Sequence, residues 1–178
     1  MFDKLIDILV QFSSNLVPFT IIPTYQAAGV LRCGRYNRTL GAGFHWKVPF
    51  FEDVHTENVY TTTMRFLPQT CVTKDRKTIV VTGMIRYRIV DVKPYICEVG
   101  DPHDVVMDVG MGAILSHIRD RTFDELIDTP PESKIASVIR RQAGTFGFEI
   151  ISFTFIDIGL TRSLRLITDA NLFSSHLL

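Results

Sequence analysis

The chain has 178 residues, which is enough for one medium-sized domain with a short appendage and a sizeable hydrophobic core. Lysine and arginine together number 19, as do aspartate and glutamate, so no basic excess points to nucleic acid. The cysteines, Cys33, Cys71 and Cys97, are odd in number and lack zinc-site or disulfide-framework spacing, which favours a reducing compartment. No small-residue cleavage site follows a basic segment near the start, so we do not expect a removable signal peptide.

The beginning of the chain indicates a membrane, because residues 8–31 contain no charged side chain, although Pro18, Pro23 and several polar residues disfavour a simple spanning helix. On a helical wheel, the apolar residues of 2–16 occupy one sector roughly 120° wide. We therefore expect an amphipathic helix and an apolar continuation that lies in one leaflet or dips into it and returns. Packing against the domain or a neighbouring subunit, and a single-pass span, are the alternatives. The predicted lipid-facing residues are Phe2, Leu5, Ile6, Leu9, Phe12, Leu16, Val17, Phe19, Ile21 and Ile22.

The stretch from 29 to 54 combines glycines, cations and aromatic rings. Residues 28–32 predict a strand, after which Gly34, Gly41 and Gly43 indicate a loop. Rings interleaved with cations suit a membrane–water interface, where each cation near an anionic leaflet contributes about 1 kcal/mol. A glycine-rich hairpin with aromatics in a core and solvated cations is the alternative. The membrane interpretation adds Arg35, Arg38, Phe44, Trp46 and Lys47 to the predicted contacts.

The order of residues within this stretch resembles a known family. Residues 34–50, GRYNRTLGAGFHWKVPF, resemble the pattern G-(K/R)-x-x-R-T-L-G-P-G-hydrophobic-H-(F/W)-K-hydrophobic-P-F of the stomatin/prohibitin/flotillin (SPFH, band-seven) domain, with Ala42 in place of the usual proline. Further matches extend the likeness over about Tyr25 to Ile167: residues 73–75, TKD, and residues 87–89, YRI, resemble the family's T-K-D and Y-R-V signatures. The resemblance implies a membrane-associated domain preceded by a proline-containing hydrophobic segment. It also implies rings or cages built by a long helix after the domain, and regulation of a membrane protease in prohibitin-like members.

The middle of the chain predicts an antiparallel sheet. Residues 53–66 are rich in threonine, valine and tyrosine, a strand composition. A turn at Lys74 and Asp75 precedes residues 77–90, where apolar and polar side chains alternate and predict a strand with one covered face. The residues predicted for the covered face are Ile79, Val81, Ile85, Tyr87 and Ile89.

Two helices and a strand are predicted next. Asp101 and Pro102 are suitable as cap and first residue of one helix, and residues 129–132, TPPE, resemble a capping box that starts a second. Residues 147–160 predict a closing strand, resembling the last strand of the family domain. This order gives an α+β fold. The residues predicted for the buried side of the first helix are Val105, Val106, Val109, Ala113, Ile114 and Ile118.

A short helix is predicted for the end of the chain, with Thr161 as its cap. Apolar and polar residues at alternating spacings of four and three form a coiled-coil-like seam, although an ordinary amphipathic helix explains it equally well. The chain thus divides into a membrane-association segment (1–24), an SPFH domain (25–160) and a short C-terminal helix (161–178). The shortness of this helix argues against a complete cage of the family type. The predicted oligomerisation residues are Leu160, Leu164, Ile167 and Asn171.

The sequence does not predict an enzyme. The five histidines lack the spacing of metal ligands, and we find no nucleophile elbow, phosphate-binding loop or dinucleotide fingerprint. We therefore expect no catalytic residue, metal or cofactor. Cys33, close to Arg32 and to the hydrophobic segment, is either an acceptor for a lipid or a small strand residue.

These patterns favour a non-catalytic scaffold on the cytoplasmic face of a membrane, which homo-oligomerises and organises membrane patches or membrane proteins. One alternative is a regulatory partner of a membrane protease or other membrane enzyme, with the acidic residues 98–128 as a docking face or simply as a solvated one. Another is a structural subunit of a larger assembly, viral assemblies included.

Overall fold

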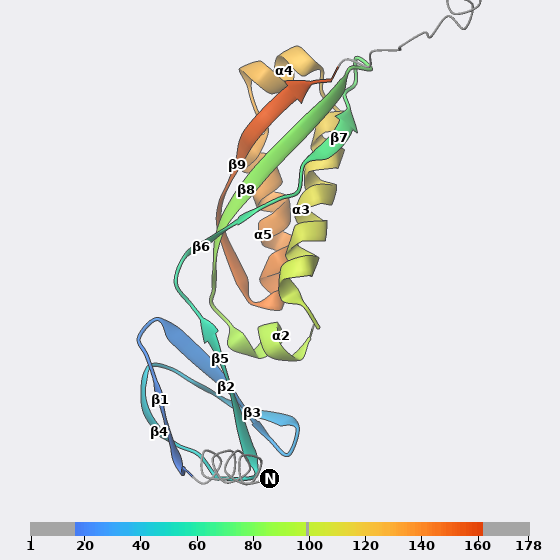
Figure 1. Ribbon diagram of the computed structural model, residues 1–178. Helices are drawn as coiled ribbons and strands as arrows, with labels where there is room; N and C mark the ends of the chain where they lie inside the picture. The colour runs from blue at the N-terminus through green and yellow to red at the C-terminus, as the bar shows by residue number, and fades with distance from the viewer. Residues whose placement is uncertain (1–16, 99, 162–178) are drawn as a thin grey trace, which may run out of the picture.

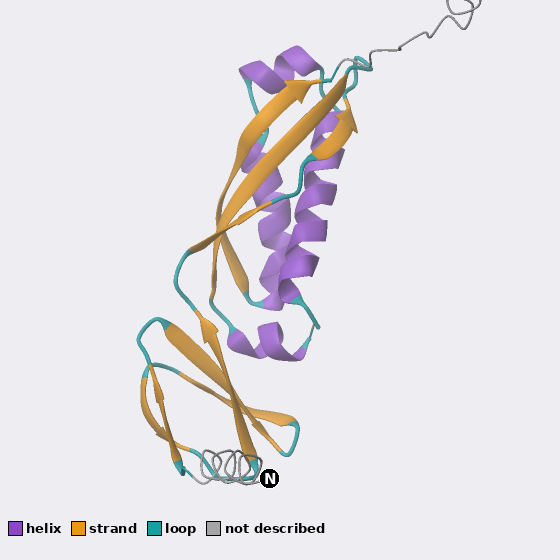
Figure 2. Cartoon of the chain, viewed as in Figure 1, coloured by secondary structure: helices purple, strands orange, loops and turns teal. Residues whose placement is uncertain are grey.

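The computed structural model describes residues 17–98 and 100–161, which form two lobes in succession (Figure 1). The N-terminal lobe contains strands only, and the second lobe contains a sheet with helices on one face (Figure 2). The predicted α+β order of a sheet followed by helices and a strand is confirmed. The predicted helix over 2–16 lies outside the described residues, as does the predicted C-terminal helix beyond its cap Thr161, with Leu164, Ile167 and Asn171, and Leu160 ends a strand.

The N-terminal lobe is a pair of small antiparallel sheets. In one, β2 (Gln26–Arg32) lies between β3 (Arg35–Leu40) and β5 (Glu52–Asn58), and in the other β1 (Phe19–Ile22) pairs with β4 (Gly43–Trp46). The loop predicted after residue 32 is therefore wrong, and the hairpin alternative is closer. Cys33 and Gly34 form a two-residue turn with φ of 50° and 76°, the backbone of a tight hairpin. The small core consists of Ile22, Ala28, Val30 and Leu40, with Val54 against it.

The second lobe is built on one long strand. β8 (Thr78–Ile89) pairs with β6 (Thr62–Arg65) and β7 (Gln69–Val72) along one edge and with β9 (Phe148–Leu160) along the other. Its alternation is confirmed, because Ile79, Val81, Ile85, Tyr87 and Ile89 are all buried in the main core. The expected strand over 53–66 is two strands, β5 in one lobe and β6 in the other.

Helices α3 (Pro102–Arg119) and α5 (Glu132–Ala143) cover one face of this sheet (Figure 1). The Asp101 carboxylate caps α3 by accepting hydrogen bonds from the backbone N–H groups of His103 and Asp104, as predicted. Of the side chains predicted to be buried on α3, Val106, Ala113, Ile114 and Ile118 are, whereas Val105 and Val109 are only partly so. Two six-residue helices, α2 (Val92–Cys97) and α4 (Phe123–Asp128), were not predicted, and a 3-10 turn, η1 (Gly144–Phe146), follows α5.

The predicted capping box at residues 129–132 is wrong. Pro131 occupies the N-cap of α5 without a side-chain hydrogen bond, and the capping box is formed instead by Thr122 and Glu125 at the start of α4. The carboxylate of Glu132 is engaged elsewhere, because it accepts a hydrogen bond from the Phe155 N–H of β9 at 2.9 Å. Arg140 of α5 donates to the Ile150 carbonyl of the same strand at 3.0 Å. These two side chains occupy backbone groups that an edge strand would otherwise expose.

Candidate membrane-facing surface and interlobe cavity

Three chain segments meet at one end of the N-terminal lobe, which we call the basal end (residues 17–19, 32–35 and 46–53) (Figure 1). The strand register places them together, because Phe19 pairs with Trp46 and Arg32 pairs with both Arg35 and Glu52. The Cys33 N–H also donates to the Phe51 carbonyl at 2.9 Å, which ties the β2–β3 turn to the β4–β5 connection. Cys33 is thus an exposed turn residue, and the strand interpretation of it is wrong.

Large apolar side chains are exposed at this end and on the adjoining face of β1 and β4. Ile21 lies opposite Phe44 and Phe19 opposite Trp46, so the four side chains share one face of the two-stranded sheet. The Phe44 ring stacks on Phe19 with ring centres 5.3 Å apart and meets the edge of Trp46 at 5.7 Å. These rings contact one another and still reach solvent. The exposed set is Val17, Phe19, Ile21, Phe44, Trp46, Val48, Phe50 and Phe51.

The predicted lipid contact of Ile22 is wrong, because this side chain is 2% exposed and belongs to the small core. The alternation of β1 turns it away from the face that carries Phe19 and Ile21. Phe50 has a φ of 66°, a left-handed conformation that costs a bulky residue roughly 1–2 kcal/mol. Backbone strain of this kind clusters at functional sites. Its aromatic ring is 62% exposed.

The almost completely buried carboxylate of Glu52 links the chain segments of the basal end through hydrogen bonds. The Arg38 guanidinium donates to both oxygens of Glu52, at 2.9 and 3.0 Å, and to the Trp46 carbonyl at 3.0 Å. The Val48 N–H also donates to Glu52, at 3.0 Å. Burial by itself raises the pKa of Glu52, but the hydrogen bonds from Val48 and Arg38, with the charges of Arg38 and Arg32, bring that pKa below its ordinary value.

The cations predicted to face the membrane therefore differ in their partners and in their exposure. Arg38 pairs with Glu52 and holds the framework, and because its side chain is still 39% exposed, its membrane contact stays a prediction. Arg35 is exposed at the basal end, where Arg32 is exposed as well, and Lys47 is half-buried beside them. The two arginines and the lysine thus belong to the same end of the lobe as the exposed rings.

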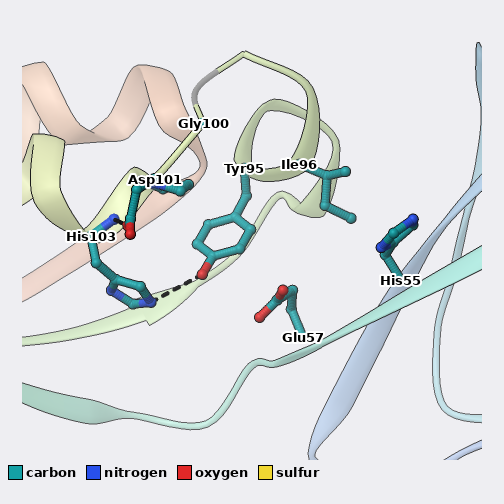
Figure 3. A pocket seen from close by; sticks show the side chains of 8 residues that line it. His55, Glu57, Tyr95, Ile96, Gly100, Asp101 and His103 are labelled. Atoms are coloured by element: carbon teal, nitrogen blue, oxygen red, sulfur yellow. Dashed lines mark hydrogen bonds between the residues drawn. The ribbon is translucent and has the colours of Figure 1, made fainter.

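A second feature is a cavity of about 310 Å³ between the lobes (Figure 3). Its walls include Glu57 of β5, Tyr95 of α2 and His103 of α3, and Glu57 extends from its strand toward Tyr95 (Figure 3). An adjoining hollow of about 150 Å³ shares these three residues and adds Tyr60 and Tyr87. The two adjoining hollows, which we together call the interlobe cavity, share these three residues and have walls from both lobes.

The His103 ring holds two tyrosines together beside this cavity. Tyr87 Oη lies 3.2 Å from Nδ1 and Tyr95 Oη lies 3.0 Å from Nε2. A neutral imidazole has one donor and one acceptor nitrogen, so one phenol donates and the other accepts. Burial, followed by the charges of Glu57, Tyr87 and Asp101, raises the pKa of Tyr95 to about 12, so its phenol stays protonated. Within the described residues, no group of histidine, cysteine and acidic side chains is arranged to hold a metal ion.

The turn between β7 and β8 is built as a structural element, as predicted. The Thr73 hydroxyl donates to Asp75 Oδ1 at 2.6 Å, and the Lys77 ammonium pairs with the other carboxylate oxygen at 3.0 Å. The Phe123 N–H of α4 also donates to Asp75, at 3.2 Å. The Thr73 hydroxyl, with Lys77 and Phe123, brings the pKa of Asp75 to about 2 against a smaller opposing effect of burial. Asp75 therefore joins the hairpin to a helix.

An acidic surface lies at the other end of the molecule, near α4 and the end of β9 (Figure 1). Asp120, Glu125 and Asp128 surround a hollow of about 440 Å³, and Arg121 beside them donates to the Thr129 carbonyl at 2.8 Å. We call this the apical end. Among the described helices, none has the combined length and apolar character that a bilayer crossing needs.

Comparison with known proteins gives a family match and several distant relatives. The profile of the SPFH domain / Band 7 family matches residues 20–169. An uncharacterised protein of Archaeoglobus fulgidus is 24% identical over 82% of this chain and 59% of its own length. One of Methanocaldococcus jannaschii is 24% identical over 73% of this chain and 66% of its own length. Protein HflK of Vibrio cholerae is 26% identical over 61% of this chain and 28% of its own length, so the chain spans less than two thirds of each of these relatives.

Proposed function

The chain belongs to the SPFH domain / Band 7 family, and on that premise we propose that it is a non-catalytic, membrane-associated scaffold, which homo-oligomerises and organises patches of membrane or membrane proteins. The single observation that carries this proposal is the basal end, where exposed aromatic rings and cations are gathered by the strand register. Such a mixture suits the headgroup region of a bilayer. We place the membrane at this end.

The free energy of membrane attachment is modest for one basal end, so we expect firm attachment only when several copies act together. Complete burial of a large apolar side chain contributes roughly 1.5–3 kcal/mol, and these rings are already partly buried, so each contributes less. Each cation adds about 1 kcal/mol near an anionic leaflet. Several such contacts give modest attachment per subunit, and repetition in an oligomer multiplies it.

The position of β1 supports the same assignment. β1 begins at the basal end, so the preceding residues of the sequence are joined to the lobe there. We propose that Phe2, Leu5, Ile6, Leu9, Phe12 and Leu16 enter the same leaflet as the rings, on the cytoplasmic face. Helical contacts after residue 161, with Leu164, Ile167 and Asn171, are proposed for oligomerisation.

Flotation of the full-length protein with vesicles tests the assignment. We compare a variant with Phe44→Ser, Trp46→Ser and Phe51→Ser against a matched variant with Leu67→Ser, Val72→Ser and Ile127→Ser, which removes similarly exposed apolar side chains from the second lobe. The basal-end variant is expected to lose about tenfold or more in partitioning, equivalent to at least ~1.4 kcal/mol, while the matched variant floats like the wild type. Equal flotation of all three proteins, or equal losses in both variants, would show that this end does not face the bilayer.

A regulatory role is the second candidate, and the relatives named HflK together with the acidic apical end favour it. In this case a membrane protease or another membrane enzyme would dock at the apical end, away from the lipid. Affinity purification from membranes separates the two functions. A stoichiometric enzyme partner supports regulation, and a pure homo-oligomer supports scaffolding.

A further inference from the structure

Among the described residues, the interlobe cavity is lined by two carboxylates and two histidines. Glu57 and Asp101 are among its lining residues, and neither hollow is lined by lysine or arginine. The Asp101 carboxylate is engaged in capping α3. The half-buried Glu57 carboxylate, in contrast, has no hydrogen-bond or ion-pair partner among residues 17–98 and 100–161. One negative charge is therefore available inside a space bounded by both lobes.

Aromatic side chains surround this charge. Tyr60, Tyr87 and Tyr95 line the smaller hollow together with Glu57. Tyrosine rings attract cations over their faces, and the attraction grows when the cation is partly desolvated. Because the hydroxyls of Tyr87 and Tyr95 are both engaged by His103, these two side chains are held in place before any ligand arrives. A carboxylate beside two fixed tyrosines and the exposed ring of Tyr60 is a combination that suits carbon-bearing ammonium groups.

The cavity does not suit an inorganic cation. Calcium takes six to eight oxygen ligands, and the described residues provide no cluster of metal-binding side chains here. Its volume of about 310 Å³, in contrast, is at the lower end of the range for small-molecule sites. A compact organic ion fits both the size and the chemistry.

We propose that the interlobe cavity binds a small organic ammonium ion, with Glu57 neutralising its charge and the rings of Tyr60, Tyr87 and Tyr95 contacting its carbon-bound surface. Glu57 belongs to the N-terminal lobe, whereas Tyr87 and Tyr95 belong to the second lobe. A bound ion therefore connects the two lobes and restrains the angle between them. This site does not depend on the membrane role of the basal end.

Saturation-transfer NMR on the full-length protein in an uncharged maltoside detergent tests the proposal, with choline and ethanolamine as probes at millimolar concentration. The neutral alcohol 3,3-dimethylbutanol, which has the shape of choline without its charge, is the matched compound. Glu57→Gln removes the carboxylate that we propose neutralises the ligand, and Asp53→Asn, at an exposed carboxylate at the other end of the same strand, is the matched variant. Circular dichroism verifies that both variants are folded.

We expect saturation transfer to choline or ethanolamine in the wild type and in Asp53→Asn, and at least about tenfold weaker binding in Glu57→Gln. Tyr60→Leu, at an exposed ring outside the regular strands, should weaken binding without loss of fold. The proposal is overturned if neither ammonium probe receives saturation, if Glu57→Gln binds as well as the wild type, or if the neutral alcohol binds as tightly as choline.

Discussion

Replacing Arg38 with methionine removes the cation that neutralises Glu52 while keeping much of the side-chain volume. The Glu52 side chain is 1% exposed and that of Arg38 is 39% exposed. Removing one partner of a buried ion pair costs ~3–5 kcal/mol. Because water reaches the guanidinium and the Val48 N–H still serves the carboxylate, we expect a loss of about 2 kcal/mol in the free energy of unfolding of the N-terminal lobe.

The sequence provides a selective probe for this measurement. Trp46 is the one tryptophan of the chain and lies in β4, where its carbonyl accepts a hydrogen bond from Arg38. Its fluorescence during urea unfolding therefore follows the N-terminal lobe, while far-UV circular dichroism follows the helices of the second lobe. A loss of 2 kcal/mol lowers the fluorescence midpoint by about 1 M urea for a slope of ~2 kcal/mol/M.

Arg88→Met is the matched control. Arg88 pairs with Glu149 at 2.6 Å, but the two side chains are 51% and 43% exposed, so the loss should not exceed ~0.5 kcal/mol. The pKa of Glu52 lies below its ordinary value of 4.5, so its stabilisation is complete above that pH and is lost as the pH falls through the lower folded-state pKa. The gap between wild type and Arg38→Met should therefore close in acid. Equal midpoints for wild type and Arg38→Met at neutral pH would refute the structural role that we give this pair.

Two further predictions concern the second lobe. Gly110→Ala places a methyl group against the Phe66 ring and should destabilise the protein by ~1–3 kcal/mol. Gly112→Ala, on the open side of the same helix, should stabilise it by ~0.5–1 kcal/mol. Thermal unfolding of both variants checks this, and a change in stability of the same sign for both would contradict it. Asp75, whose pKa is lowered from 3.8 to about 2, stabilises the fold fully above pH 3.8 and loses this effect as the pH falls toward 2. In acid titrations followed by circular dichroism, the Asp75→Asn variant should be less stable than the wild type at neutral pH, and the two stabilities should converge near pH 2. A stability difference that stays constant down to pH 2 would contradict the role that we give the hydrogen bonds and ion pair of Asp75.

Long periodic elements could be predicted from the sequence because one physical signal dominates each of them. The alternation over β8 reflects a strand with one covered face, and Asp101 with Pro102 marks the start of α3. Two short helices, α2 and α4, were missed because six residues are too few to establish a helical period. The capping box was placed at the wrong threonine, since Thr129 and Thr122 both precede a glutamate by three residues, and Glu132 is drawn to the β9 backbone.

The candidate site could be predicted in composition but not in arrangement. The sequence shows several aromatic rings around Lys47 over residues 44–51, and the fold adds that β1 and the β2–β3 turn reach the same end. It could not show that Arg38 faces a buried carboxylate, because Glu52 lies fourteen positions away on another strand. The tyrosine–histidine group was also missed: Tyr87, Tyr95 and His103 are spaced eight residues apart, but they come from one strand and two different helices, so the periodicity of a single element does not indicate that they meet.

Because β8 is long, charges at one end of the molecule have little effect on charges at the other end. Twelve residues at ~3.3 Å each span about 40 Å, whereas the Debye length at physiological ionic strength is about 8 Å. If the bilayer lies at the basal end, as we propose, its negative charge is therefore screened long before it reaches Asp124, Glu125 and Asp128 at the apical end. On that proposal, lipid that attracts Arg32 and Arg35 does not repel the acidic surface, which stays open to a basic protein approaching from the aqueous side.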